Sequence, residues 1–122
     1  MLISKLILER TDPAIGWGFI THKLGEIKPY IQKNYFDTGK LIVRGTTVSD
    51  DQLILISASQ WLNNEEREKY NKDPVISEKH KLLRQYWAEK LINARWENYE
   101  YKDGVLCRNW SGVLVENNII KI

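Results

Sequence analysis

The chain has 122 residues, and its 18 basic and 16 acidic side chains leave a formal net charge of only +2. This length fits a single domain over residues 1–122, and so small a charge excludes attraction of the whole molecule to nucleic acid or to an acidic membrane. Cys107 is the only cysteine, which excludes an internal disulfide and favours a reducing, cytoplasmic location.

The first predicted elements are two strands. Residues 2–9 are aliphatic and β-branched, and this run is too short for a signal-peptide core or a membrane span. Residues 15–21 place Ile15, Trp17 and Phe19 on one side, and small glycines on the other. We expect a strand whose glycine face admits another backbone or a ligand.

The middle of the chain predicts one short helix and two further strands. Pro29 in a first turn favours a helix over residues 28–35. Apolar runs at 41–44 and 52–57 favour strands, with a loop over 45–51 between them.

Two helices are expected next, and the second is the longer. Ser57 is expected to cap the first of these helices through a capping box. This helix has a narrow apolar face and ends before Asp73-Pro74. Ser77 is the expected cap of the main helix, which runs to Tyr99 or Tyr101.

The last part of the chain returns to strand chemistry. Ser111-Gly112 and Asn117-Asn118 are expected as turns between short apolar runs at 105–108, 113–116 and 119–122. The order of strands, helices and strands predicts an α+β fold. We expect an antiparallel or mixed sheet with one long and one or two short helices packed on one face.

The predicted long helix carries two apolar faces. One face suits the sheet, while Ile92, Trp96 and Tyr99 follow one another at i, i+4 and i+7 on the opposite side. A helix lying on a sheet buries one face there, so its own chain, a second copy or a partner must cover the second column. Arginine and aromatic side chains are enriched where interfaces concentrate their binding energy.

The leading hypothesis is therefore a non-enzymatic interaction or regulatory domain, such as a small inhibitor, adaptor or accessory subunit. It would bind a protein partner, or itself as a homodimer, through Ile92, Arg95, Trp96 and Tyr99. No spacing of His, Cys or carboxylate residues matches a metal site, and neither a cofactor nor a catalytic residue is expected.

Two alternatives belong to other classes. A small-molecule-binding domain or enzyme would use a pocket near Trp17 and His22, with Asp50 and Asp51 contributed by the loop before a strand. A nucleic-acid binder would use the cations of the long helix, but the glutamates between them leave no basic stripe. The sequence offers no route to a membrane-bound role.

Overall fold

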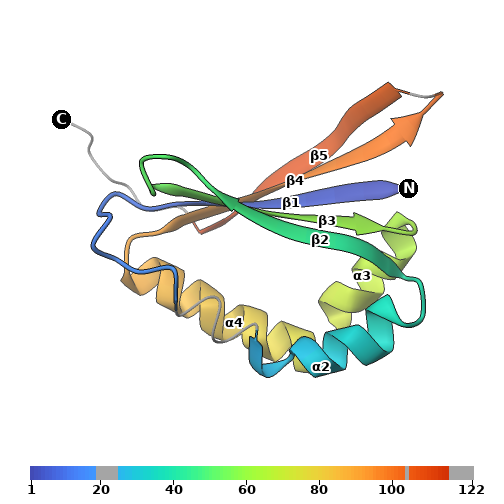
Figure 1. The fold of residues 1–122 in the computed structure, drawn as a ribbon, viewed down its shortest axis with the longest axis horizontal. Coiled ribbons are helices and arrows are strands. Elements are labelled where there is room, and N and C mark those ends of the chain that lie inside the picture. The colour runs from blue at the N-terminus through green and yellow to red at the C-terminus, as the bar shows by residue number, and fades with distance from the viewer. Residues whose placement is uncertain (19–24, 104, 116–122) are drawn as a thin grey trace.

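The computed structural model describes residues 1–18, 25–103 and 105–115 (Figure 1). In chain order the elements are β1 (Leu2–Glu9), α2 (Lys28–Ile31), the π-helix η1 (Gln32–Phe36), β2 (Leu41–Val48), β3 (Ile54–Trp61), α3 (Asn64–Lys72), α4 (Pro74–Glu89), β4 (Asn93–Lys102) and β5 (Val105–Val115).

The strands form one sheet in the order β2-β3-β1-β4-β5, and every neighbouring pair is antiparallel. The chain passes from β1 to β2 through α2 and η1, and from β3 to β4 through α3 and α4. The helices labelled in Figure 1 all lie on one side of the sheet. The expected α+β class is confirmed, with an antiparallel sheet and its helices on one face.

Two apolar clusters fill the ends of the space between the sheet and the helices. Leu2 packs with Trp61 in the first cluster, and Leu8 packs with Trp87 in the second. Alternate residues of a strand face the same side, so β1 also turns Ser4 toward the helices, between these two leucines. A serine fills much less volume than a leucine, which leaves the middle of the layer hollow.

The two consecutive helices begin at side-chain caps. Asn63 accepts a hydrogen bond from the backbone N of Glu66, and Asp73 accepts one from Val75 N, each at 2.9 Å. α4, with 16 residues, is the longest helix in the described part of the chain. No helix there combines the length and the apolar character needed to cross a membrane.

Several predicted boundaries in this region are wrong. Ser57 lies within β3, and Ser77 lies inside α4 because Asp73 already caps that helix. The loop predicted over residues 45–51 begins only at Ser49, since β2 pairs with β3 as far as Val48.

The long helix predicted to reach Tyr99 is also wrong. Leu91 adopts a positive φ of 57°, and the backbone N–H of Ile92 donates back to the last turn of α4. This left-handed ending usually employs glycine, which the sequence does not have here. β4 then begins, and its alternation turns Trp96 and Tyr99 to opposite faces of the sheet.

The structure differs from two further predictions, a strand at residues 15–21 and a turn at Ser111-Gly112. Residues 15–18 are not a strand; they follow a turn in which Ile15 N donates to Asp12 O at 3.1 Å. β5 is continuous, so the turn predicted at Ser111-Gly112 is wrong. The elements predicted at 19–21, 117–118 and 119–122 lie outside the described residues.

The outer face of the sheet carries no helix in the described ranges (Figure 1). Ile3, Val43 and Ile56 lie there around a shallow depression of about 370 Å³. Val43 is 55% exposed. This face therefore presents apolar surface that the described helices leave uncovered.

Candidate functional site: a cationic cavity between sheet and helices

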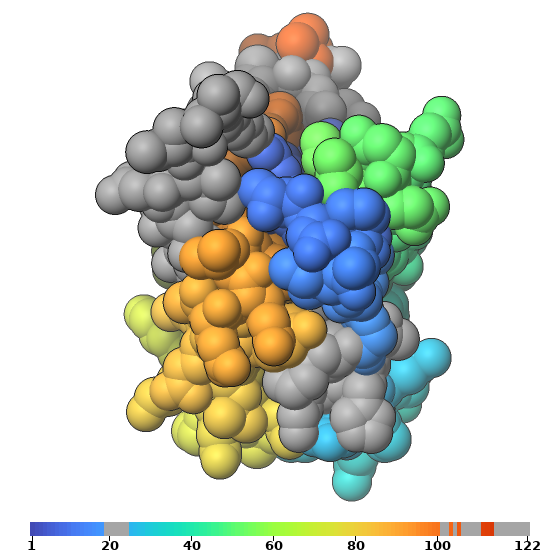
Figure 2. Space-filling model, turned by 90° about the vertical axis from the view of Figure 1, so that its left-hand side faces the viewer, coloured from blue at the N-terminus to red at the C-terminus, as the bar shows by residue number. Residues whose placement is uncertain are grey.

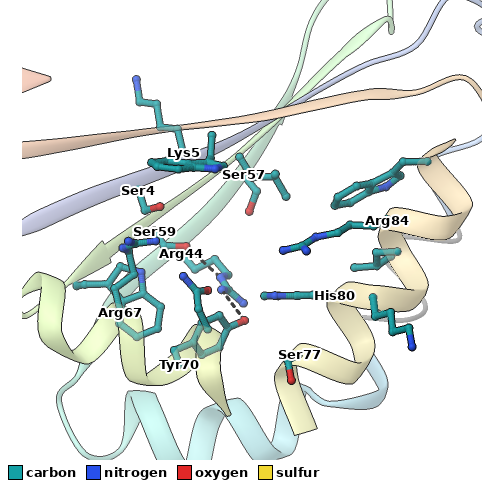
Figure 3. A pocket seen from close by; sticks show the side chains of 17 residues that line it. Ser4, Lys5, Arg44, Ser57, Ser59, Arg67, Tyr70, Ser77, His80 and Arg84 are labelled. Carbon is teal, nitrogen blue, oxygen red and sulfur yellow. Dashed lines mark hydrogen bonds between the residues drawn. The ribbon is translucent and has the colours of Figure 1, made fainter. Parts of the chain in front are cut away.

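A cavity of about 480 Å³ lies between the sheet and the helices (Figure 3). We call it the interlayer cavity. Its floor includes Ser4, Ser57 and Ser59 on the helix-facing side of the sheet. These side chains are small, so they leave space that bulky side chains would fill. Other lining residues come from all of β1 to β4 and from α3 and α4, so that residues far apart in the sequence meet around it.

Three arginines line the interlayer cavity, each from a different element. Arg44 comes from β2, Arg67 from α3 and Arg84 from α4. Among the described residues that line it there is no aspartate or glutamate. A cleft lined by one sign of charge attracts ligands of the opposite sign, so the lining favours an anion.

Neutral groups hold Arg44 in place. Its Nε donates to Ser59 Oγ and its Nη2 to the Tyr70 hydroxyl, both at 3.2 Å. Figure 3 shows Arg44 and Arg84 pointing from opposite walls toward the same space. Within the described residues, no hydrogen bond or ion pair is formed by the side chain of Arg84. The two contacts of Arg44 orient its guanidinium without neutralising it.

Arg67 is partly buried in the wall. Burial lowers the pKa of its guanidinium, and its Nε donates to Asn64 Oδ1 at 3.2 Å. The guanidinium carbon is 5.9 Å from the centre of the Trp96 ring, so a cation from α3 faces an aromatic side chain from β4.

His80 projects from α4 beside these cations (Figure 3). Burial, together with the charges of Arg44 and Arg84, lowers its pKa from 6.5 to about 4. The imidazole is therefore neutral at neutral pH and can either donate or accept a hydrogen bond. Its ring lies 5.7 Å from that of Tyr70, in an edge-on arrangement.

Trp96 forms an aromatic part of the cavity wall. A Cβ placed on Gly112 of β5 would come within 2.7–2.8 Å of three atoms of the indole ring. The ring therefore lies directly against the backbone of the neighbouring strand, an approach that any larger residue at position 112 would obstruct.

Two buried polar side chains lack hydrogen-bond partners within the part of the chain that the structure describes. One is the Nε1 of Trp87, which lines the interlayer cavity, and the other is the amide of Asn98. Asn98 pairs across the sheet with Ser4 and so belongs to the same face as the cavity floor. Unsatisfied buried groups are uncommon and often mark functional sites.

The residues predicted to bind a partner do not form one surface. Ile92 is fully buried in the second apolar cluster, and Trp96 lines the interlayer cavity. Arg95 and Tyr99 lie on the outer face of the sheet, where both contact Glu97. The structure thus divides the predicted docking column among the core, the cavity and the opposite face.

Trp17, Asp50 and Asp51, which were predicted to form a pocket, are not among the described residues that line the interlayer cavity. Figure 2 shows the segment after β1 beside the β2–β3 turn and the end of α4. Trp17 Nε1 donates to Gln52 O at 3.2 Å there, and the Arg10 guanidinium lies 4.3 Å from the Trp17 ring. These contacts join Trp17 to the β2–β3 turn, and a pocket beside Trp17 stays a prediction.

Of the other residues predicted to line that pocket, Asp50 and Asp51 lie in the β2–β3 turn. Asp51 holds the β2–β3 turn, accepting hydrogen bonds from Ser49 Oγ and Leu53 N, and these bonds lower its pKa. Asp50 is exposed in the same turn. His22 lies outside the described residues.

Arg44 and Arg67 were not expected at a site from the sequence, and His80 was not connected with Arg84. A usable signal was the serines at alternate positions of β3, since polar side chains on the buried face of a strand suggest a polar interior. The pairing of Ser4 with Ser59 in the adjacent strand reinforces it.

Comparison with known proteins shows the fold of this chain. No protein-family model and no curated protein sequence matches it. A solved structure from Deinococcus radiodurans, provisionally described as an antibiotic biosynthesis monooxygenase, superposes with a TM-score of 0.60 at 12% identity, covering 86% of this chain and 96% of that one. A dimeric ferredoxin-like protein from an uncultured marine organism gives a TM-score of 0.53 at 13% identity, covering 97% of each chain. The fold is therefore ferredoxin-like.

The leading functional prediction, a non-enzymatic interaction or regulatory domain, is wrong. Its basis was a helix with two apolar faces, and β4 occupies that part of the chain. The ferredoxin-like neighbours agree better with the alternative prediction of a small-molecule-binding domain or enzyme.

Proposed function

We propose that this protein binds a small organic anion in the interlayer cavity. The observation that carries the proposal is the approach of Arg44, Arg67 and Arg84 to one cavity whose described lining contains no carboxylate. Arg44 is partly buried and its hydrogen-bond partners Ser59 and Tyr70 are neutral, while Arg84 is exposed on the wall that faces it. A carboxylate or phosphate between these two cations would be attracted by both and would accept hydrogen bonds in the fork geometry of a guanidinium.

The size of the cavity supports a small ligand. Its volume of about 480 Å³ lies within the range of ordinary ligand pockets, roughly 300–1,000 Å³. Most of the side chains that line it are polar or charged, and a few apolar side chains lie beside them. Leu83 and Trp87 exemplify the apolar part.

A thermal-shift screen of carboxylates and phosphate esters tests the proposal. A ligand at about a hundred times its Kd stabilises a protein by about 2.7 kcal/mol, which should raise the Tm by roughly 10 °C for a chain of this size. Arg84→Gln should reduce the shift. Arg95→Gln loses the same charge on the outer face and should preserve it. The proposal is refuted if no anion stabilises the protein, or if both variants respond alike.

A second candidate is an enzyme that acts on the bound anion, and His80 favours it. A neutral imidazole can take a proton from the ligand, while Arg44 and Arg84 stabilise the charge that develops. The anion would also offset these cations and raise the pKa of His80 toward its ordinary value. Screening hits should then exchange a proton for deuterium in D₂O, followed by NMR, and His80→Asn should stop the exchange. Binding without any exchange would contradict proton abstraction by His80.

We also propose that two copies associate through the outer face of the sheet. The uncovered Ile3, Val43 and Ile56 support this, as does the ferredoxin-like neighbour described as dimeric. Light scattering should give twice the mass of the chain, and Val43→Lys should halve it. A monomer in both cases would contradict the association.

Because Cys107 is the only cysteine, we place the assembly in a reducing cytoplasm.

A further inference from the structure

The interlayer cavity has two chemically different ends. Arg44 lies on β2 and Trp96 on β4, and the sheet order places β3 and β1 between these strands. Neighbouring strands are about 4.8 Å apart, so the strands that carry these residues are roughly 14 Å apart. A single small anion such as free phosphate could occupy one end and leave the other without contact.

The cationic end consists of Arg44, His80 and Arg84. Figure 3 shows the three side chains converging from β2 and α4. The hydroxyl of Ser57 points into the same space from the sheet. Guanidinium forks, a neutral imidazole and a hydroxyl together offer donors to the oxygens of one acidic group.

The other end is an aromatic platform. The Trp96 ring lies against the sheet backbone at Gly112, so its opposite face is turned away from the sheet. The indole also lines the interlayer cavity, so part of the ring borders the space that a ligand would fill. Aromatic rings stack in offset arrangements with centroids about 4.5–7 Å apart. The platform therefore suits a flat ring better than a flexible alkyl chain.

We propose that the ligand is an elongated aromatic acid, with its acidic group among Arg44, His80 and Arg84 and its ring on Trp96. This inference rests on the proposed function and adds the second part of the ligand and its direction in the interlayer cavity. The acidic group supplies the charge that the arginines attract, and the ring selects among acids of similar length.

A series of probes tests the proposal by isothermal titration calorimetry. Benzoate, 3-phenylpropanoate and 5-phenylpentanoate vary the distance between the acid and the ring, and the tightest of them is chosen. Its primary amide should bind about 10- to 100-fold more weakly, because hydrogen bonds to a charged group are lost. Its cyclohexyl analogue should bind about 2- to 10-fold more weakly, because the stacking is lost.

Two variants then assign each preference to its end of the cavity. Arg84→Gln should remove most of the preference for the acid over the amide and retain the preference for the phenyl ring. Trp96→Leu should do the reverse. Arg95→Gln on the outer face, with the same change of charge, should retain both.

The outcomes separate this inference from the proposed function. If the acid is preferred but the cyclohexyl analogue binds equally well, or if Trp96→Leu leaves the ring preference intact, the aromatic platform is refuted and the anion site stands. If neither these acids nor any other anion binds, both proposals fail.

A spectroscopic measurement keeps the test decisive should Trp96→Leu not fold. The protein labelled with 5-fluorotryptophan carries five indoles, and Trp96→Phe identifies the signal of position 96. That signal should shift with the phenyl probe much more than with its cyclohexyl analogue. Equal shifts would overturn the assignment of the ring to Trp96.

Discussion

Arg44 and Tyr70 connect the edge strand of the sheet to helix α3. The Arg44 Nη2 donates to the Tyr70 hydroxyl at 3.2 Å, and the guanidinium carbon lies 5.6 Å from the centre of the same ring. Because Tyr70 also belongs to the first apolar cluster, this pair joins the core to the cationic end of the interlayer cavity.

The first prediction concerns the hydroxyl in this pair. Tyr70→Phe keeps the ring in the core and removes the acceptor for Arg44, so the free energy of unfolding should fall by about 1–2 kcal/mol in urea titrations. Affinity for an anion should also fall, because Arg44 loses one of its two fixed contacts. Ser59→Ala removes the other contact and should have an effect of the same sign. Unchanged stability in both variants would contradict a positioning role for these hydroxyls.

The sequence predicted those parts of the fold that depend on local pattern. β1 was expected over residues 2–9 and is observed there, because its aliphatic run is long and bounded by Asp12-Pro13. The end of α4 could not be predicted in the same way. Leu91 adopts a left-handed conformation that favours glycine. Because the sequence has leucine and not glycine there, it gives no sign that the helix ends at this point.

The site was much less accessible to sequence reasoning than the fold. Arg44 and Tyr70 are 26 residues apart in the chain and meet only because β2 pairs with β3 and α3 folds back under the sheet. Charges that seem scattered along the sequence therefore converge. The alternation of Arg95, Trp96 and Glu97 is compatible with either a helix or a strand in so short a segment.

The second prediction concerns Asp73, which joins three parts of the helical layer. Its Oδ2 accepts hydrogen bonds from the hydroxyls of Tyr30 at 2.7 Å and Tyr35 at 2.5 Å, while its Oδ1 caps α4. Asp73→Asn keeps a capping oxygen but weakens both tyrosine contacts, so the free energy of unfolding should fall by about 2 kcal/mol. Asp50→Asn, in an exposed turn, should change it by less than about 0.5 kcal/mol.

The same carboxyl should contribute to acid unfolding. Burial acts to raise the pKa of Asp73, but the hydrogen bonds from Tyr35 and Tyr30 outweigh it and lower the pKa. Its contribution to stability is therefore present above the ordinary aspartate pKa of about 3.9 and is lost as the pH falls through the lowered value. Asp73→Asn should show a smaller loss of stability in that acidic range. An identical pH profile would contradict the assignment.

The third prediction concerns His80 at mildly acidic pH. The pKa of His80 is lowered from 6.5 to about 4 by burial and by Arg44 and Arg84, so the unfolded chain takes up a proton that the folded protein excludes. Stability should consequently fall as the pH falls from about 6.5 to about 4, by up to about 3 kcal/mol, and change little from this source above that range. Urea titrations at each pH measure the effect. His80→Asn should flatten the profile, whereas His22→Asn, the same change at the other histidine, should leave this part of it in place.

The fourth prediction concerns the contact between Gly112 and Trp96. Gly112→Ala would place a methyl group within 2.7–2.8 Å of the indole, so the ring or the strand must move, at a cost of about 1–3 kcal/mol in the free energy of unfolding. Gly45→Ala is the matched control, since no atom lies within 4 Å of its added Cβ, and it should have a much smaller effect. Because the indole forms the aromatic platform, Gly112→Ala should also weaken binding of the phenyl probe more than that of its cyclohexyl analogue. Equal losses of stability at positions 112 and 45 would mean that β5 does not hold the indole against its backbone, and the orientation proposed for the ligand ring would lose its support.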